Sequence, residues 1–172
     1  MKSFKLSVFL VLFCFFSPSA SADFSGDFAP AKWSYQESDP SENGPSATLS
    51  PSTMQITSAD WPSGGAAVAN TWGQYGIEIP WYLQTISFEY SYVTGDVDGS
   101  SFDMPSYTLN GAKTNLVASN IPQFGSASGS VTLDVSSLAG KSLLFTQACT
   151  DCVLGLHQFL LETFLQSLEV PY

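Results

Sequence analysis

The sequence has few basic residues and no arginine. Its 172 residues include five lysines, one histidine and 15 acidic residues, which gives a formal net charge of −10 at pH 7. A charge of this sign repels nucleic acid and anionic membranes, so we expect neither as a partner. It is typical of a protein that stays soluble, or collects cations, outside the cell.

Long apolar runs are also absent, except at the N-terminus. Two lysines precede an apolar run over residues 6–16, which is too short to span a bilayer, and the small residues Ala20-Ser21-Ala22 follow. This order predicts a cleaved signal peptide over residues 1–22 and a single mature domain over residues 23–172. The mature net charge is then −12, because 3 lysines remain against 15 acids. We expect a secreted protein, extracellular or periplasmic, with no membrane span in the mature chain.

Strand patterns dominate the mature sequence. Apolar and polar residues alternate with period two over Thr85–Tyr92 and again over Val131–Ser136, as in strands with one buried face. The dipeptide Asn110-Gly111 lies between two short β-prone segments and predicts a tight hairpin turn. Many short strands with turns between them predict a β-sandwich. Further strands are expected at Lys32–Tyr35, Ala47–Leu49, Thr53–Thr57, Gly76–Ile79 and Ser142–Gln147.

The segment over residues 156–168 fits two structures. Its apolar residues recur at helical spacing, and Leu, Gln and Glu are good helix formers. The alternative is a final central strand, Leu156–Phe164, which is apolar on both sides because both of its faces are covered.

Several short motifs occur in an order that resembles a family of secreted bacterial β-sandwich proteins, many of which carry a PEP-CTERM sorting tail. The motifs are Phe28–Trp33 near the mature start, the strand Ile86–Tyr92 before an acidic loop, the Tyr-x-Leu-Asn-Gly hairpin Tyr107–Gly111, and a closing strand that ends near Phe164. The resemblance covers nearly all of the mature chain.

This resemblance implies a jelly-roll-like antiparallel sandwich in an extracellular or surface setting. It also favours the strand over the helix for Leu156–Phe164. The tail of the family is missing, because residues 168–172 read Leu-Glu-Val-Pro-Tyr, so sorting and anchoring are not implied. The family lends no activity.

An acidic loop over residues 95–103 is a candidate calcium site. Asp96, Asp98 and Asp103 place three carboxylates within nine residues, and calcium takes six to eight oxygen ligands. The loop departs from an EF-hand after its Asp-x-Asp-Gly start, so an exposed acidic turn without an ion is the alternative.

Two cysteines remain in the mature chain, Cys149 and Cys152, in a C-x-x-C motif. Because an oxidising compartment favours pairing, we expect a small loop disulfide. A thioredoxin-type redox site needs a helix after the motif, and a strand is expected here.

No catalytic constellation is evident. His157 is the only histidine, and no nucleophile-elbow sequence accompanies it. A histidine near the end of a buried strand is more often structural, so we expect a protein that is not an enzyme.

The aromatic residues suggest a ligand. Trp61, Trp72, Trp81 and Tyr82 occur within or beside a stretch rich in Gly and Pro, and exposed rings on loops can stack on sugars. Alternatively, these rings cap the sandwich edges as part of the core. Two functions stay open: a non-catalytic binding module for extracellular polysaccharide or matrix components, and a structural matrix protein without a small ligand.

Overall fold

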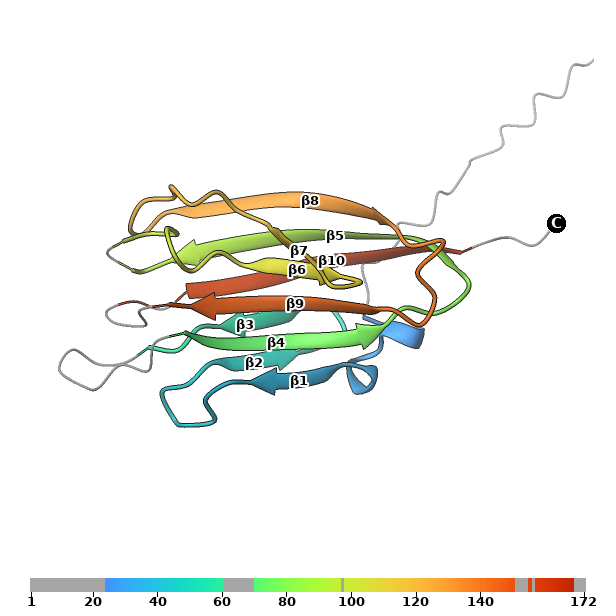
Figure 1. The fold of residues 1–172 in the computed structure, drawn as a ribbon, viewed down its shortest axis with the longest axis horizontal. Coiled ribbons are helices and arrows are strands. Elements are labelled where there is room, and N and C mark those ends of the chain that lie inside the picture. The colour runs from blue at the N-terminus through green and yellow to red at the C-terminus, as the bar shows by residue number, and fades with distance from the viewer. Residues whose placement is uncertain (1–23, 61–69, 97, 151–154, 156, 169–172) are drawn as a thin grey trace, which may run out of the picture.

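The chain folds into a sandwich of two antiparallel five-stranded sheets (Figure 1). This computed structural model describes residues 24–60, 70–96, 98–150, 155 and 157–168, so the expected signal peptide lies outside it. The predicted all-β, jelly-roll-like antiparallel sandwich is confirmed. Within the described ranges, no helix has the length and apolar character needed to cross a membrane.

The two sheets are each assembled from strands that are distant in sequence. Sheet A has the order β1-β4-β9-β6-β7, and sheet B has the order β2-β3-β10-β5-β8. The strands are β1 (Ser34–Glu37), β2 (Ser46–Leu49), β3 (Met54–Thr57), β4 (Thr71–Glu78), β5 (Leu83–Thr94), β6 (Ser106–Leu109), β7 (Ala112–Asn115), β8 (Ser126–Asp134), β9 (Ser142–Cys149) and β10 (His157–Leu168).

The period-two alternation sets which side of β5 is buried. Ile86 and Phe88 point into the core and pair with Leu133 and Val131 of β8. The outward residues are polar, as in the 2.8 Å hydrogen bond between the Ser87 and Thr132 hydroxyls. Because side chains alternate at every residue, a slip of one position would turn this apolar set outward.

The hairpin between β6 and β7 turns at the predicted dipeptide. Asn110 has φ 48° and Gly111 has φ 83°, the positive values that this two-residue turn requires. The register Leu109↔Ala112 closes the ladder directly beside the turn.

Strand β10 explains why its sequence resembles a helix. The pairing with β5 shifts between Leu161 and Thr163, which places one extra residue in β10. Phe159 and Leu161 alternate normally into the core, and Phe164, three residues further on, is buried as well. The bulge therefore gives a buried strand an apolar spacing of three, and the strand expected at Leu156–Phe164 is confirmed in type and extends to Leu168.

The segment before β1 seals one end of the sandwich. It forms two 3₁₀ turns, η1 (Gly26–Phe28) and η2 (Pro30–Lys32). Phe28 and Trp33 pack on Phe164, with ring centroids 4.8 and 5.9 Å away, and the Trp33 indole N–H donates to the Phe28 carbonyl. The core thus extends beyond the strands themselves.

Candidate functional site

The structure separates the aromatic residues that the sequence places in one stretch. Trp81 and Tyr82 lie together, with ring centroids 5.7 Å apart at 85°, and Trp81 is 78% exposed. Trp72 is half-buried at the opposite end of β4, and Trp61 lies outside the described residues. The interpretation that all these rings cap the core is therefore wrong for Trp81.

The length of β4 causes this separation. The sequence predicts a short strand at Gly76–Ile79, whereas β4 spans Thr71–Glu78. From Trp72 to Glu78 the strand advances about 20 Å at 3.3 Å per residue. Because side chains alternate along β4, its outer face carries Trp72, Gln74, Gly76 and Glu78. Trp72 lies at one end of this strip, and Trp81 lies beyond the other end.

A shallow groove lies on this strip beside Trp81. It consists of two adjoining hollows of about 290 and 320 Å³, which share Lys32, Ile77 and Glu78. We call it the Trp81 groove. Its sheet part is lined further by Ser34, Gln36, Gln74, Gly76, Ser142 and Leu144. Its end is lined further by Asp27, Pro80, Trp81 and Tyr82.

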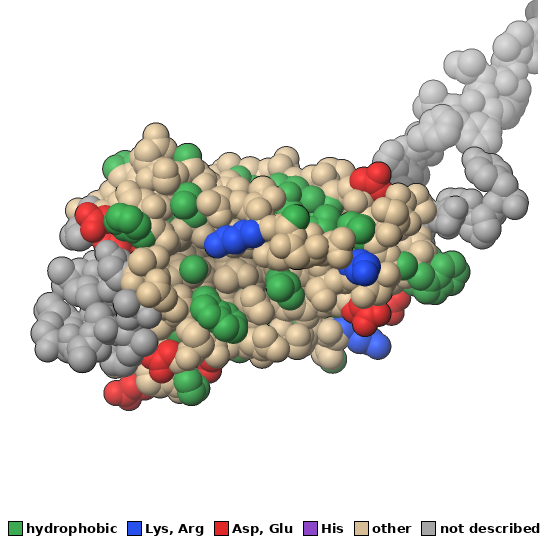
Figure 2. Space-filling view, in the orientation of Figure 1, with side chains coloured by type: hydrophobic (Ala, Val, Ile, Leu, Met, Phe, Trp, Pro, Cys, Tyr) green, Lys and Arg blue, Asp and Glu red, His purple; other side chains and the backbone are tan. Residues whose placement is uncertain are grey.

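Uncharged polar groups form much of the sheet part of the Trp81 groove. The Gln74 side-chain amide donates to the Gln36 carbonyl oxygen, and the Thr146 hydroxyl donates to the Gln74 oxygen, both at 3.3 Å. Each glutamine amide has two N–H donors and a carbonyl acceptor, so capacity for a ligand remains. On the face seen in Figure 2, acidic side chains lie toward the ends, and the charged side chain in the middle is basic.

Tyr82 is held in place at the end of the groove. Its hydroxyl donates a hydrogen bond to the Asp27 carboxylate. This bond favours the protonated phenol and raises the pKa of Tyr82 above its ordinary value. The hydrogen bond to Asp27 anchors the Tyr82 ring, which lies nearly perpendicular to the ring of Trp81.

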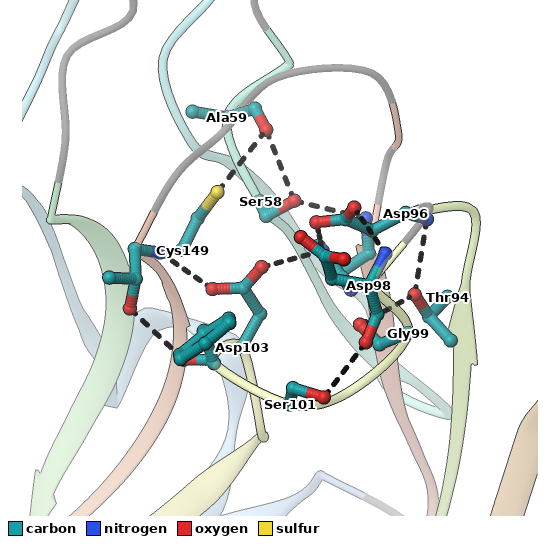
Figure 3. Close-up of polar contacts among 12 residues, drawn as sticks. Ser58, Ala59, Thr94, Asp96, Asp98, Gly99, Ser101, Asp103 and Cys149 are labelled. Atoms are coloured by element: carbon teal, nitrogen blue, oxygen red, sulfur yellow. Dashed lines mark hydrogen bonds and ion pairs between the residues drawn. The ribbon is translucent and has the colours of Figure 1, made fainter. Parts of the chain in front are cut away.

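The acidic loop at the other end of the sandwich is not a simple exposed turn. Asp96 and Asp103 are 2% and 1% exposed, whereas Asp98 is exposed. Figure 3 shows Asp96 and Asp103 on the segment that links β5 to β6. The structure thus brings two of the three predicted carboxylates into the interior.

His157 joins these two carboxylates. Its Nε2 atom lies 2.9 Å from Asp103 Oδ2 and 3.4 Å from Asp96 Oδ2, and the histidine side chain is fully buried. Its Nδ1 atom lies 2.8 Å from the Tyr92 hydroxyl. Burial raises the pKa of Tyr92, so this hydroxyl keeps its proton.

Backbone groups fix the orientation of both carboxylates. The Asp98 N–H donates to Asp96 Oδ1 at 3.0 Å, and the Thr150 N–H donates to Asp103 Oδ1 at 2.6 Å. In each aspartate, one oxygen is therefore held by the backbone and the other faces His157. We call Asp96, Asp103 and His157 the buried triad.

The loop that carries the aspartates is itself anchored. The Ser100 hydroxyl donates to the Ala118 carbonyl and accepts from the Ile121 N–H, at 2.6 and 3.0 Å. The Gln147 side-chain amide donates to the Asp103 carbonyl at 2.7 Å. These bonds tie the loop to its neighbours and to β9, so the triad is built on a fixed frame.

The sequence pattern predicts a structural role for His157 and does not associate it with the acidic loop. The first residue of β10 pairs with Thr94, two positions before Asp96, and this register makes the association. A substrate could not reach the imidazole in this arrangement because the three side chains are buried.

The predicted Cys149–Cys152 disulfide stays a prediction. Cys149 ends β9 and is buried, whereas Cys152 lies outside the described residues.

Comparison with known proteins supports the fold. No family model and no curated protein matches the chain. Among solved structures, the K1 cleaved adhesin domain of Lys-gingipain from Porphyromonas gingivalis W83 is similar, with a TM-score of 0.50 and 10% identity over 82% of this chain and 93% of that chain. The N-terminal cellulose-binding domain of β-1,4-glucanase C from Cellulomonas fimi gives a TM-score of 0.40 and 13% identity over 88% of this chain and 95% of that chain.

Proposed function

We propose that the protein is a secreted, non-catalytic binding module that holds a neutral extracellular polysaccharide in the Trp81 groove. The observation that carries this proposal is Trp81 itself, whose large apolar ring is 78% exposed at the end of a polar groove. A ring of this size loses hydrophobic stabilisation when it stays in water, and stacking on the apolar face of a sugar recovers it.

The groove provides the polar contacts that sugar hydroxyls need. The Gln36 and Gln74 amides and the Ser34 and Ser142 side chains lie along its floor. Each can donate to or accept from a hydroxyl group. Gly76 has no side chain to fill the groove, and Leu144 lies so close that a Cβ at position 76 would come within 2.7 Å of its Cδ2 atom.

The charge of the chain favours a neutral ligand. The mature net charge of −12, with 3 lysines against 15 acids, repels acidic polysaccharides, and Lys32 is the one basic side chain among the described lining residues of the groove. An extended neutral chain could lie along β4 from Trp81 toward Trp72.

The test is a glycan array followed by titration of the parent and variants with the best neutral oligosaccharide, with titration calorimetry as the readout because Trp81→Ala removes the fluorophore at the site. Trp81→Ala should lose binding at least about 10-fold, because burial of a large apolar side chain contributes roughly 1.5–3 kcal/mol. The matched control is Phe124→Ala, which removes an aromatic ring that is 77% exposed and outside the groove. It should bind as the parent does.

Two results would count against the proposal. Equal binding by the parent and by Trp81→Ala would place the ligand elsewhere. An array without any bound glycan would favour the structural matrix protein that needs no small ligand.

A further inference from the structure

We propose that the buried triad of Asp96, Asp103 and His157 binds a zinc-class divalent ion that fastens the β5–β6 loop to β10. This site is separate from the Trp81 groove. It also differs from the calcium site expected from the sequence, because a nitrogen donor replaces the exposed Asp98 carboxylate.

The first argument is geometric. One donor atom from each of the three side chains can be chosen so that all lie within 4.8 Å of one another. The His157 Nε2 atom is 2.9 and 3.4 Å from the two Oδ2 atoms. Donors around a tetrahedral zinc ion are about 3.3 Å apart when the metal–donor bonds are 2.0–2.2 Å. Two of the three donor separations are therefore near this spacing, and the third is at most 4.8 Å. Three protein donors with a water molecule as the fourth ligand would complete a tetrahedral zinc site.

The second argument is that His157 Nε2 is buried without a hydrogen-bond partner. It is near both carboxylates, but neither contact has hydrogen-bond geometry. A buried polar atom without a partner destabilises the fold, because it loses its hydrogen bond to water and forms none within the protein. An ion located among the three donor atoms would satisfy the nitrogen and both oxygens together.

The third argument is charge. Among the described residues, His157 is the one basic side chain within ion-pair distance of Asp96 or Asp103. Even a protonated imidazole would leave one of the two buried negative charges uncompensated, and a buried unpaired charge is strongly unfavourable. A divalent cation bound by a neutral imidazole balances both carboxylates.

The surroundings of the triad orient its donors for a metal. The Tyr92 hydroxyl lies 3.5 Å from the Asp103 carbonyl oxygen, to which it can donate, and it can then accept from the His157 Nδ1–H. That tautomer leaves the Nε2 lone pair directed at the ion, in the manner of metal-bound histidines whose second nitrogen is hydrogen-bonded. The backbone N–H groups of Asp98 and Thr150 hold the far carboxylate oxygens.

The donor set selects the class of ion. Imidazole suits zinc and other late first-row divalent metals, whereas calcium takes oxygen ligands almost exclusively. A mixed set of one nitrogen and two carboxylate oxygens therefore favours zinc over calcium.

The experiment uses the protein purified without a polyhistidine tag, stripped with a chelator and dialysed. Zinc, calcium and magnesium chlorides are added at matched ionic strength. Zinc at about 100 times its Kd should raise the Tm by roughly 5–10 °C. Because the chain has one histidine, ¹⁵N NMR reports the site directly. Zinc should shift the His157 Nε2 resonance far more than the Nδ1 resonance.

Two variants locate the effect. Asp103→Asn keeps the size of the side chain but removes a ligand charge, and it should weaken zinc binding at least about 10-fold. Asp98→Asn is the matched control, since it removes an exposed carboxylate of the same loop and should bind zinc as the parent does.

Each other outcome overturns the proposal. Stabilisation by calcium without a shift of the imidazole nitrogens would mean an all-oxygen site in this loop. Equal loss in Asp98→Asn and Asp103→Asn would mean a general charge effect. No change in Tm or in the ¹⁵N spectrum of the parent with any ion would mean that the triad is a polar network without an ion. This outcome is measured on the parent protein, so it does not depend on whether the variants fold.

Discussion

Removal of one oxygen atom from Tyr92 tests whether the polar network at the end of the sandwich stabilises the fold. Tyr92 is fully buried, and its ring stacks on His157 with centroids 6.0 Å apart at 11°. Tyr92→Phe keeps this ring and deletes only the hydroxyl, which lies 2.8 Å from His157 Nδ1. The substitution therefore leaves a buried imidazole nitrogen without its partner.

The expected cost follows from that orphaned group. A buried donor or acceptor that loses its partner destabilises a protein by about 1–3 kcal/mol. In a domain of this size, 1 kcal/mol corresponds to about 2–4 °C in Tm, so Tyr92→Phe should lower the Tm by roughly 2–12 °C. Urea unfolding in the presence of a chelator measures this free energy without a contribution from bound metal.

Tyr90→Phe is the matched control on the same strand. The Tyr90 hydroxyl donates to the Leu116 carbonyl at 2.6 Å, but Tyr90 is only half-buried, so water can replace the lost donor. We expect a cost of about 0.5–1.5 kcal/mol for this variant. The reasoning is refuted if Tyr92→Phe costs no more than Tyr90→Phe at equal m-values.

Three further substitutions test single features of the fold. Gly111→Ala should cost about 1–2 kcal/mol in urea unfolding through strain alone, because φ is +83° and no atom lies within 4 Å of the added Cβ; an unchanged midpoint would contradict this. Gly155→Ala should destabilise by roughly 1–3 kcal/mol, since its Cβ would clash with the Asp96 backbone nitrogen, and a Tm equal to that of the parent would show that the loop can shift without cost. Ser136→Ala should raise the pKa of Asp134 in an NMR titration, because the Ser136 hydroxyl and N–H now lower it. The stabilisation from Asp134 is present above the unfolded-state pKa and is lost as pH falls through the lowered folded-state pKa, so the parent should lose more stability than Ser136→Ala on acidification.

Local patterns in the sequence were sufficient to predict most strands. The alternation over Thr85–Tyr92 and the Asn110-Gly111 dipeptide act through neighbouring residues, and both predictions are confirmed. Strand β10 was different, because its bulge arises from pairing with β5 and imitates a helical period. Local pattern alone favoured the helix there, and only the family resemblance favoured the strand.

The two candidate sites depended on information that the sequence does not display. The sequence groups Trp72 and Trp81 in one stretch with a short strand at Gly76–Ile79, whereas β4 spans eight residues and places the two rings at its opposite ends. The buried triad needs the register Thr94↔His157, which joins residues 63 positions apart. The predicted Asp96 and Asp103 are part of it, but the sequence gives no sign that their third partner is His157 rather than Asp98.

The two sites are physically independent. Strand β5 has 12 residues and advances about 36 Å from the Trp81 end of the sandwich to the buried triad. The floor of the Trp81 groove is formed by β1, β4 and β9 of sheet A, whereas the triad joins the β5–β6 loop to β10 of sheet B. A packed core separates the two sheets. Coupling between the sites would need an element with two conformations that both ligands favour differently, and a close-packed core provides none. An ion at the triad would therefore stabilise the end of the sandwich without changing the affinity of the groove for its ligand. If polysaccharide binding fails its test, the zinc proposal is unaffected, and the reverse also holds.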